Sequence, residues 1–240
     1  MLTKIYMVNK ENKLNINNFR YERKFILDNN LINNLRSLES YFQIDLKEQF
    51  EERRINSIYY DTHNFIFSRQ TQDGISERKK VRIRYYGLLN QINNPKLEVK
   101  SKLGMIGRKD IYDINKENYI SNYFSIHNLE LKQNQNNLNY ILFKRLYPKL
   151  LITYNRQYFL SLCKRYRFTL DNNIMFKRFD FQNLSLNFDS QLYYLYPRKI
   201  LEIKYSKEDD VNASYFTRTL PTRLTSLSKY LIAIKTLGLF

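Results

Sequence analysis

The sequence contains few cysteine, histidine and glycine residues and no tryptophan. Its 240 residues include one cysteine, two histidines, five glycines and no tryptophan. A single cysteine, Cys163, excludes an internal disulfide framework and fits a reducing compartment, and two histidines argue against a zinc site. We interpret His63 and His127 as ordinary surface or turn residues.

Glycine-rich phosphate-binding loops and long apolar runs are also missing. Neither Gly-x-x-x-x-Gly-Lys-Ser/Thr nor Gly-x-Gly-x-x-Gly occurs, so a bound nucleotide would be held by side chains and not by a backbone cradle. No apolar run of about 18 residues and no signal-peptide core are found. The sequence therefore predicts a cytoplasmic protein with no transmembrane segment of its own.

Positive charge is abundant. Lys and Arg number 40 against 23 Asp and Glu, which gives a formal net charge of +17. This excess favours a polyanionic partner, and it leaves nucleic acid, anionic lipid and phosphate polymers open. The length fits one domain with a sizeable core, and we expect a polar leader at residues 1–17 before a single domain at 18–240.

Charged residues recur two positions apart in six short segments. In a strand, residues i and i+2 point to the same face, so each segment predicts a strand with one apolar and one charged face. For a single pair, a solvated edge explains the spacing equally well. The repetition needs a common explanation, and Arg suits bidentate binding of phosphate. Closing these strands into a barrel would place the charges around a lumen. The segments are 20–24, 82–84, 98–100, 154–158, 165–167 and 202–204.

The order of the predicted elements favours an α+β fold, an antiparallel β-barrel tunnel with flanking helices. We expect a helix at 29–42 with Asp28 as N-cap, a helical region at 116–147 closed by Pro148, and a final helix at 224–237. A short segment at 65–69 lies between two turns. The expected strands are 19–27, 55–61, 78–86, 96–102, 108–114, 150–160, 164–171, 175–181 and 198–205.

Three of the charged segments place a glutamate two positions before a lysine: Glu22 before Lys24, Glu98 before Lys100, and Glu202 before Lys204. These residues could form cross-strand salt bridges only. Carboxylates among many cations also suit a site for a divalent metal and phosphate, since the metal needs oxygen ligands and the cations hold the remaining phosphate oxygens. The residues alone leave both interpretations open.

Taken in order, eight short motifs resemble the VTC domain, the polyphosphate polymerase domain of the vacuolar transporter chaperone complex and its bacterial relatives. This domain belongs to the triphosphate tunnel metalloenzymes, or CYTH-like group. The resemblance covers residues 18–236 and implies a tunnel-shaped antiparallel barrel that binds a nucleoside triphosphate and a divalent metal, Mn²⁺ or Mg²⁺. The motifs are RYERKF at 20–25, SIYYD at 57–61, RIRYYG at 82–87, LEVK at 97–100, YNR at 154–156, RYRFTLD at 165–171, LEIK at 201–204 and SKY at 228–230.

The resemblance also implies site residues. Phosphate-binding and catalytic residues fall on Lys24, Arg82, Arg84, Lys100, Arg156, Arg167 and Lys229. We include Lys204 and Arg108 in the substrate-binding set, with Lys109 as the rival of Arg108, and assign the metal to Glu202 with Glu22. Tyr60, Asp61 and Asp171 are assigned to the barrel wall or to orienting other side chains.

Two departures from the family pattern matter. Arg20 replaces the first acid of the wider group, which points to the VTC branch and away from the simple triphosphatases. Ser226 replaces a basic residue that the family places before Lys229, and Arg223 is the candidate substitute. Without that substitution, the grip on the phosphate chain is weaker.

The resemblance implies an ATP-dependent polyphosphate polymerase, which transfers the γ-phosphoryl group of ATP to phosphate or to a growing polyphosphate chain. Its partners are then ATP, inorganic phosphate and polyphosphate, not DNA, and a membrane-protein partner stays open. One alternative is a tunnel-fold phosphohydrolase that uses water as acceptor and shares nearly every site residue. The other is a non-catalytic module that binds polyphosphate or RNA.

Overall fold

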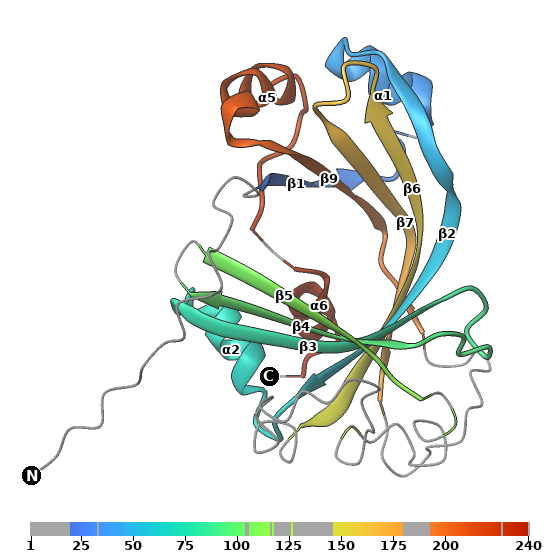
Figure 1. Ribbon diagram of the computed structural model, residues 1–240, viewed down its shortest axis with the longest axis vertical. Helices are drawn as coiled ribbons and strands as arrows, with labels where there is room; N and C mark the ends of the chain where they lie inside the picture. Colours follow the sequence, from blue (N-terminus) through green and yellow to red (C-terminus); the bar gives the residue numbers. More distant parts are fainter. Residues whose placement is uncertain are drawn as a thin grey trace, which may run out of the picture.

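The protein folds around one strongly curved antiparallel sheet (Figure 1). The computed structural model describes residues 20–32, 34–103, 106–115, 117, 126, 146–179, 193–226 and 228–239. The strands are β1 (Arg20–Asp28), β2 (Leu46–Asp61), β3 (Glu77–Tyr86), β4 (Lys96–Leu103), β5 (Ile106–Asp113), β6 (Tyr147–Ser161), β7 (Arg167–Arg178), β8 (Tyr194–Leu195) and β9 (Arg198–Ser206). The helices are α1 (Leu35–Phe42), α2 (Ile66–Gln72), α5 (Asp210–Thr217) and α6 (Lys229–Thr236), with a 3₁₀ turn at Lys207–Asp209.

The strand order in the sheet is β1-β9-β7-β6-β2-β3-β4-β5, and β8 pairs with β7. Among the described residues, every pair of neighbouring strands in the sheet is antiparallel. Among the described residues, no pairing joins the edge strands β1 and β5, so the sheet curves strongly without closing into a barrel. With that difference, the predicted α+β antiparallel barrel with flanking helices is confirmed.

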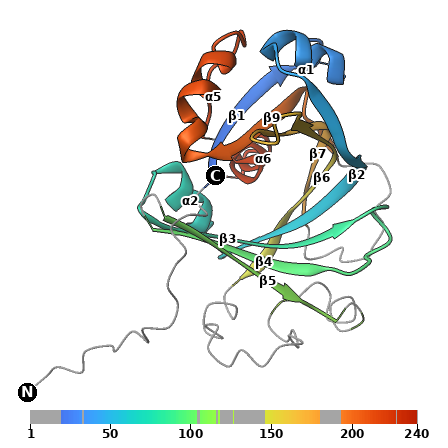
Figure 2. The same ribbon diagram turned by 45° about the horizontal axis from the view of Figure 1, so that its top comes forward.

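Alternation along the strands separates the two faces of the sheet. On β3, Val81 and Ile83 are fully buried on one face, and Arg82 and Arg84 lie between and beyond them on the other. The apolar face forms one core with Phe67 of α2 and a second core with α1 and α5. The charged face is the concave one, where α6 packs within the curve of the sheet (Figure 2).

Helix α6 is shorter than the predicted helix at 224–237. Ser228 is its N-cap and accepts a hydrogen bond from the backbone N–H of Leu231 at 3.2 Å. The preceding residues instead run along β1, where Leu224 bridges to Phe25 and the N–H of Thr225 donates to the carbonyl of Lys24 at 2.9 Å. The apolar spacing that predicted a longer helix therefore belongs partly to this extended segment.

Bulges explain two further differences in the strands. The strands predicted at 164–171 and 175–181 form one strand, β7, because Asn173 takes a left-handed conformation (φ 48°) and lets the strand continue past a register shift. Pro148 lies within β6 at another register shift and does not close a helix there. The rest of the helical region predicted at 116–147 is outside the described residues, apart from 117, 126 and 146.

Three further elements were predicted with wrong boundaries or missed. Helix α1 begins after Asn34, whose side chain accepts from the N–H of Ser37 at 2.9 Å, and Asp28 is the last residue of β1 and not an N-cap. Strand β2 begins at Leu46, although its exposed first half does not show the buried pattern that predicted 55–61. Helix α5 was missed because its apolar residues Val211 and Tyr215 are exposed, so no amphipathic stripe marks it.

Candidate functional site

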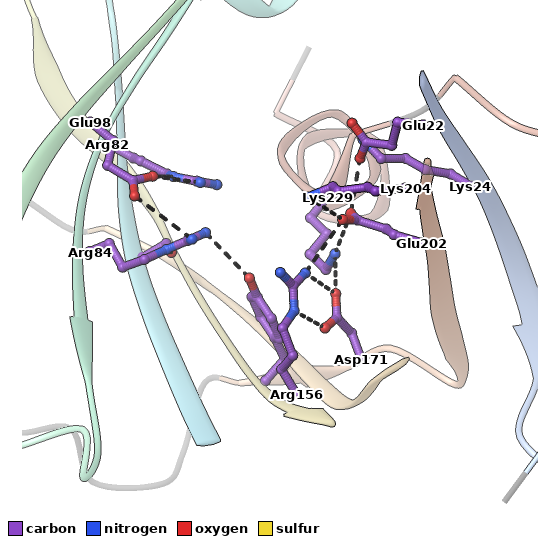
Figure 3. Close-up of polar contacts among 12 residues, drawn as sticks. Glu22, Lys24, Arg82, Arg84, Glu98, Arg156, Asp171, Glu202, Lys204 and Lys229 are labelled. Atoms are coloured by element: carbon purple, nitrogen blue, oxygen red, sulfur yellow. Dashed lines mark hydrogen bonds and ion pairs between the residues drawn. The ribbon is translucent and has the colours of Figure 1, made fainter. Parts of the chain in front are cut away.

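The candidate site is the concave face of the sheet. Figure 3 shows Arg82, Arg84 and Glu98 on one side of this face, pointing toward Arg156, Glu202 and Lys229 on the other. The structure brings together most of the predicted residues, from β1, β3, β4, β6, β9 and α6. These are Glu22, Lys24, Arg82, Arg84, Lys100, Arg156, Glu202, Lys204 and Lys229.

The first cluster is built around Glu98 of β4. Arg82 donates from Nε to the Glu98 carboxylate at 2.7 Å and also donates to the Tyr59 hydroxyl at 2.8 Å. Lys109 donates to the same carboxylate at 2.8 Å, and the guanidinium of Arg84 lies 3.9 Å away. Burial opposes ionisation of Glu98, but the charges of Arg82, Arg84 and Lys109 outweigh it and lower the pKa of Glu98 to about 2.

Arg84 is held less firmly than Arg82. Its contacts to the Ser57 hydroxyl and the Tyr154 hydroxyl are both 3.4 Å long, and its ion pair with Glu98 is 3.9 Å. Hydrogen bonds of this length are weak, so the guanidinium keeps donors for an incoming anion.

The second cluster is built around Asp171 of β7, which is completely buried. Arg156 binds its carboxylate in bidentate fashion, from Nε at 2.5 Å and from Nη2 at 2.7 Å, and Lys229 forms a further ion pair with it. The ammonium of Lys229 also lies 4.9 Å from the ring centre of Tyr154. Asp171 thus fixes the position of two of the predicted phosphate-binding cations.

The third cluster is built around Glu202 of β9, a buried carboxylate. Burial opposes its ionisation, but the neighbouring charges, led by those of Lys229 and Arg156, hold the pKa of Glu202 well below its usual range. No cation in its shell comes closer than 3.5 Å: they are Lys229 at 3.5 Å, Arg156 at 3.7 Å, Lys204 at 3.8 Å and Lys24 at 3.9 Å.

The shell around Glu202 leaves its oxygens available for a further ligand. Lys24 joins this shell to Glu22, with which it forms a 2.8 Å ion pair. Within the described ranges, no group of three or more His, Cys, Asp or Glu side chains could hold a metal alone. Mg²⁺ is commonly held by one or two carboxylates together with substrate phosphates and water. Glu202 and Glu22 therefore fit a metal that is completed by a bound triphosphate.

The concave face contains Lys109 and not Arg108. Lys109 is paired in register with Lys100 and reaches Glu98, whereas Arg108 is paired with Ser101 on the other face. The Arg108 side chain is 74% exposed and binds Asp110 at 2.7 Å. This placement corrects the choice of Arg108.

Four other residues named from the sequence lie at or outside the margin of these clusters. Arg167 is exposed and pairs in register with Lys204 at the end of β7. Arg223 and Ser226 are both exposed and precede α6, so neither stands on the helix one turn before Lys229. Arg165, predicted in a strand with Arg167, lies in the turn before β7 and pairs with Asp209 at 3.3 Å.

Asp61 and Tyr230 position α2 and α6 relative to each other. The Asp61 carboxylate accepts from the backbone N–H groups of Phe67 and Ser68, at 2.9 and 3.0 Å, and from the Tyr230 hydroxyl at 2.9 Å. Tyr230 also stacks on Tyr59 with ring centres 4.9 Å apart. Because Tyr230 follows Lys229 directly, this network orients the lysine toward the site.

Lys80 is a cation of the concave face that the sequence did not predict as a site residue. Lys80 of β3 stands two residues before Arg82 on the same face and pairs in register with Lys100. Burial and the charges of Lys24 and Lys100 lower the pKa of Lys80 to about 7. The signal was present in the sequence, because the alternation of Arg82 and Arg84 continues backward through Lys80 and Arg78.

The VTC domain family model matches residues 19–238. The chain belongs to the VTC domain family. No curated protein matches this VTC-domain chain. In the parts of the chain that the structure describes, no helix is both long and apolar enough to cross a membrane.

Solved structures are similar to this chain at low sequence identity. HpAC1 from Hippeastrum, described as a candidate adenylyl cyclase with a dominant triphosphatase activity, is 11% identical, with 92% of this chain and 96% of that chain covered and a TM-score of 0.51. The PH1819 protein from Pyrococcus horikoshii OT3 is 11% identical, with 91% and 98% covered and a TM-score of 0.48. The likeness to HpAC1 supports the tunnel-type fold of this VTC domain.

Proposed function

We propose that this VTC domain is a metal-dependent polyphosphate polymerase that transfers the γ-phosphoryl group of ATP to phosphate or to a growing polyphosphate chain. The observation that carries the proposal is the convergence of Lys24, Arg82, Arg84, Arg156 and Lys229 on one concave face. A triphosphate is the kind of ligand that such a set of cations would bind.

Substrate binding would exchange internal ion pairs for phosphate contacts. Arg84 has the weakest internal contacts and is the first candidate to bind a phosphate oxygen. Arg156 and Lys229 stay fixed by Asp171, which keeps their remaining donors aimed at the substrate. Positioning of this kind is most of what phosphoryl transfer asks of a protein.

Glu202, with Glu22, would hold the divalent metal. A divalent metal held there, Mn²⁺ or Mg²⁺, would supply Lewis-acid stabilisation of the negative charge that develops on the phosphate oxygens. The surrounding cations Lys24 and Lys204 neutralise the oxygens that the metal does not reach.

The transfer itself needs no protein nucleophile. An oxygen of the acceptor phosphate forms the new bond to the γ-phosphorus. The bond between the γ-phosphorus and the β,γ-bridging oxygen breaks, and ADP leaves with that oxygen and the electron pair of the bond. The acceptor is already anionic, so a general base is not required. Among the described residues, none of the side chains assigned to the concave face is a histidine.

The second candidate function is a phosphohydrolase in which water is the acceptor. The triphosphatase activity described for HpAC1, which shares the fold, favours this candidate. Polymerase and hydrolase would use the same cations and Glu202, so they differ in the acceptor and not in the triphosphate site. A cytoplasmic location, a membrane-protein partner and the absence of a DNA partner stay predictions.

The test is incubation of the purified protein with ATP and Mn²⁺, followed by gel analysis of long-chain polyphosphate and assay of free phosphate. We expect polyphosphate from the parent and a loss on the order of a hundredfold in Glu202→Gln, equal to about 2.7 kcal/mol in the barrier. Metal-free nucleotide binding should survive in this variant. Glu77→Gln, which changes an exposed glutamate paired with Lys79, is the control and should retain full activity.

If Glu202→Gln makes polyphosphate as fast as the parent, the metal role of Glu202 is wrong. If the parent releases phosphate and makes no polymer, the hydrolase replaces the polymerase. If it does neither while still binding polyphosphate, the protein is a binding module.

A further inference from the structure

Among the described residues, Lys80 and Lys100 of the concave face have no carboxylate partner, whereas six other cations of this face do. Arg82, Arg84, Arg156, Lys24, Lys204 and Lys229 each lie within 4.0 Å of an acidic side chain. Among the described residues, no acidic group lies within that distance of Lys80 or Lys100. When protonated, these two side chains therefore carry charge that no described acidic group neutralises by direct contact.

The two lysines are neighbours. Lys80 of β3 and Lys100 of β4 are directly opposite each other in the antiparallel register, so their side chains leave the sheet side by side on the concave face. Lys24 of β1 faces both from across the curve, and its charge acts on both. Like charges this close destabilise each other unless an anion lies between them.

The opposite end of the concave face is aromatic. Phe50 and Tyr158 pack edge to face with ring centres 5.8 Å apart, and the guanidinium of Arg53 lies 5.4 Å from the Phe50 ring. Phe50 is 48% exposed and Tyr86, at the end of β3, is 43% exposed. Tyr86 is close enough to Tyr158 for the two hydroxyl groups to interact electrostatically. Exposed aromatic rings beside Arg suit stacking of a nucleobase.

These two ends give a bound nucleotide a direction. Along β3, the concave face carries Lys80, Arg82, Arg84 and Tyr86 in order, and each two-residue step is about 6.6 Å. A nucleoside at the aromatic end places its phosphates on Arg84 and then Arg82, with the terminal phosphate nearest Lys80. The group next to that phosphate in a transfer reaction is the acceptor.

We propose that Lys80, with Lys100, forms an acceptor subsite that binds the phosphate or polyphosphate chain receiving the γ-phosphoryl group, separate from the triphosphate site. This inference rests on the proposed function, because it names the place of the second substrate in the same reaction. Lys80 is the distinguishing residue, since Lys100 also faces the charges of Glu22, Lys204 and Glu202.

The test is calorimetry on the parent and two single variants. Each protein is first titrated with the non-hydrolysable β,γ-imido analogue of ATP and Mn²⁺, and the saturated protein is then titrated with tripolyphosphate. Lys80→Gln should weaken tripolyphosphate binding by about tenfold or more, the loss expected for one charge-assisted hydrogen bond, and change analogue affinity by less than about twofold. Lys79→Gln is the matched control, since it removes the same charge from the neighbouring position on the other face and should change neither affinity.

Three results would overturn the subsite. The first is an equal loss of affinity for the ATP analogue and for tripolyphosphate in Lys80→Gln, which would place Lys80 in the triphosphate site. The second is unchanged tripolyphosphate binding in Lys80→Gln, or the same loss in Lys79→Gln. The third is a parent protein that, once saturated with the analogue, binds no tripolyphosphate. Calorimetry needs no turnover, so a parent that makes no polymer but loses tripolyphosphate binding in Lys80→Gln would refute the polymerase and retain the subsite.

Discussion

Asp171→Asn should reduce stability strongly, because Asp171 is the buried counter-charge of two cations. Its carboxylate has no exposed surface and accepts both donors of the Arg156 fork, and Lys229 forms an ion pair with it. In the variant, Glu202 is the nearest remaining carboxylate that pairs with them, 3.7 Å from Arg156 and 3.5 Å from Lys229. Removing one partner of a buried ion pair lowers stability by about 3–5 kcal/mol.

The measurement is thermal and urea unfolding in phosphate-free buffer. A loss of about 3 kcal/mol corresponds to a fall in melting temperature of roughly 6–12 °C for a chain of this size. The control is Asp110→Asn, which breaks the ion pair to the exposed Arg108 and should change stability by less than about 0.5 kcal/mol. A loss in Asp171→Asn no larger than that in Asp110→Asn would refute the reasoning, since Arg156 and Lys229 would then not depend on Asp171.

Two further predictions concern anion binding. Arg84→Ala should weaken ATP binding by about tenfold in calorimetry. The melting temperature should stay nearly unchanged, because the internal hydrogen bonds of the Arg84 side chain are 3.4 Å long and weak. Unchanged ATP affinity would show that Arg84 does not belong to the site. The affinity for tripolyphosphate should fall as pH rises above about 7. Burial and the facing charges of Lys24, Lys100, Arg78 and Arg82 lower the pKa of Lys80 to about 7, so the amine loses its charge in this range. Anion binding favours the protonated amine and raises its pKa, so binding takes up a proton; a pH profile identical in Lys80→Gln would contradict this.

The charged face was predictable from the sequence because the strand period is two. Arg82 and Arg84 alternate with Val81 and Ile83, and the same two-residue spacing links Glu202 to Lys204, so one face of each strand could be read directly. Contacts between side chains that are far apart in the sequence could not be predicted. The contacts of Arg156 with Asp171 and of Lys24 with Glu202 join residues whose neighbourhood depends on the order of strands in the sheet.

The failures have local physical causes. Whether Lys109 or Arg108 faces inward depends on the length of the β4–β5 connection, because a shift of one residue moves every side chain to the other face. Leu224 continues the apolar spacing of α6, but Leu224 and Thr225 pair with β1, and only the Ser228 cap marks the true start of the helix. Lys80 lies outside the motif at 82–87, so the family pattern does not predict it as a site residue.

The most direct test of the central proposal is the fate of the phosphoryl group. Purified protein is incubated with Mn²⁺ and ATP labelled at the γ-phosphate with ³²P, in parallel with ATP labelled at the α-phosphate, and the products are separated on a gel. The polymerase predicts that the γ-label enters long-chain polyphosphate while the α-label remains in ADP, and that added tripolyphosphate increases incorporation of the γ-label. Release of the γ-label only as free phosphate, with no labelled polymer at any concentration of added tripolyphosphate, would contradict the proposal.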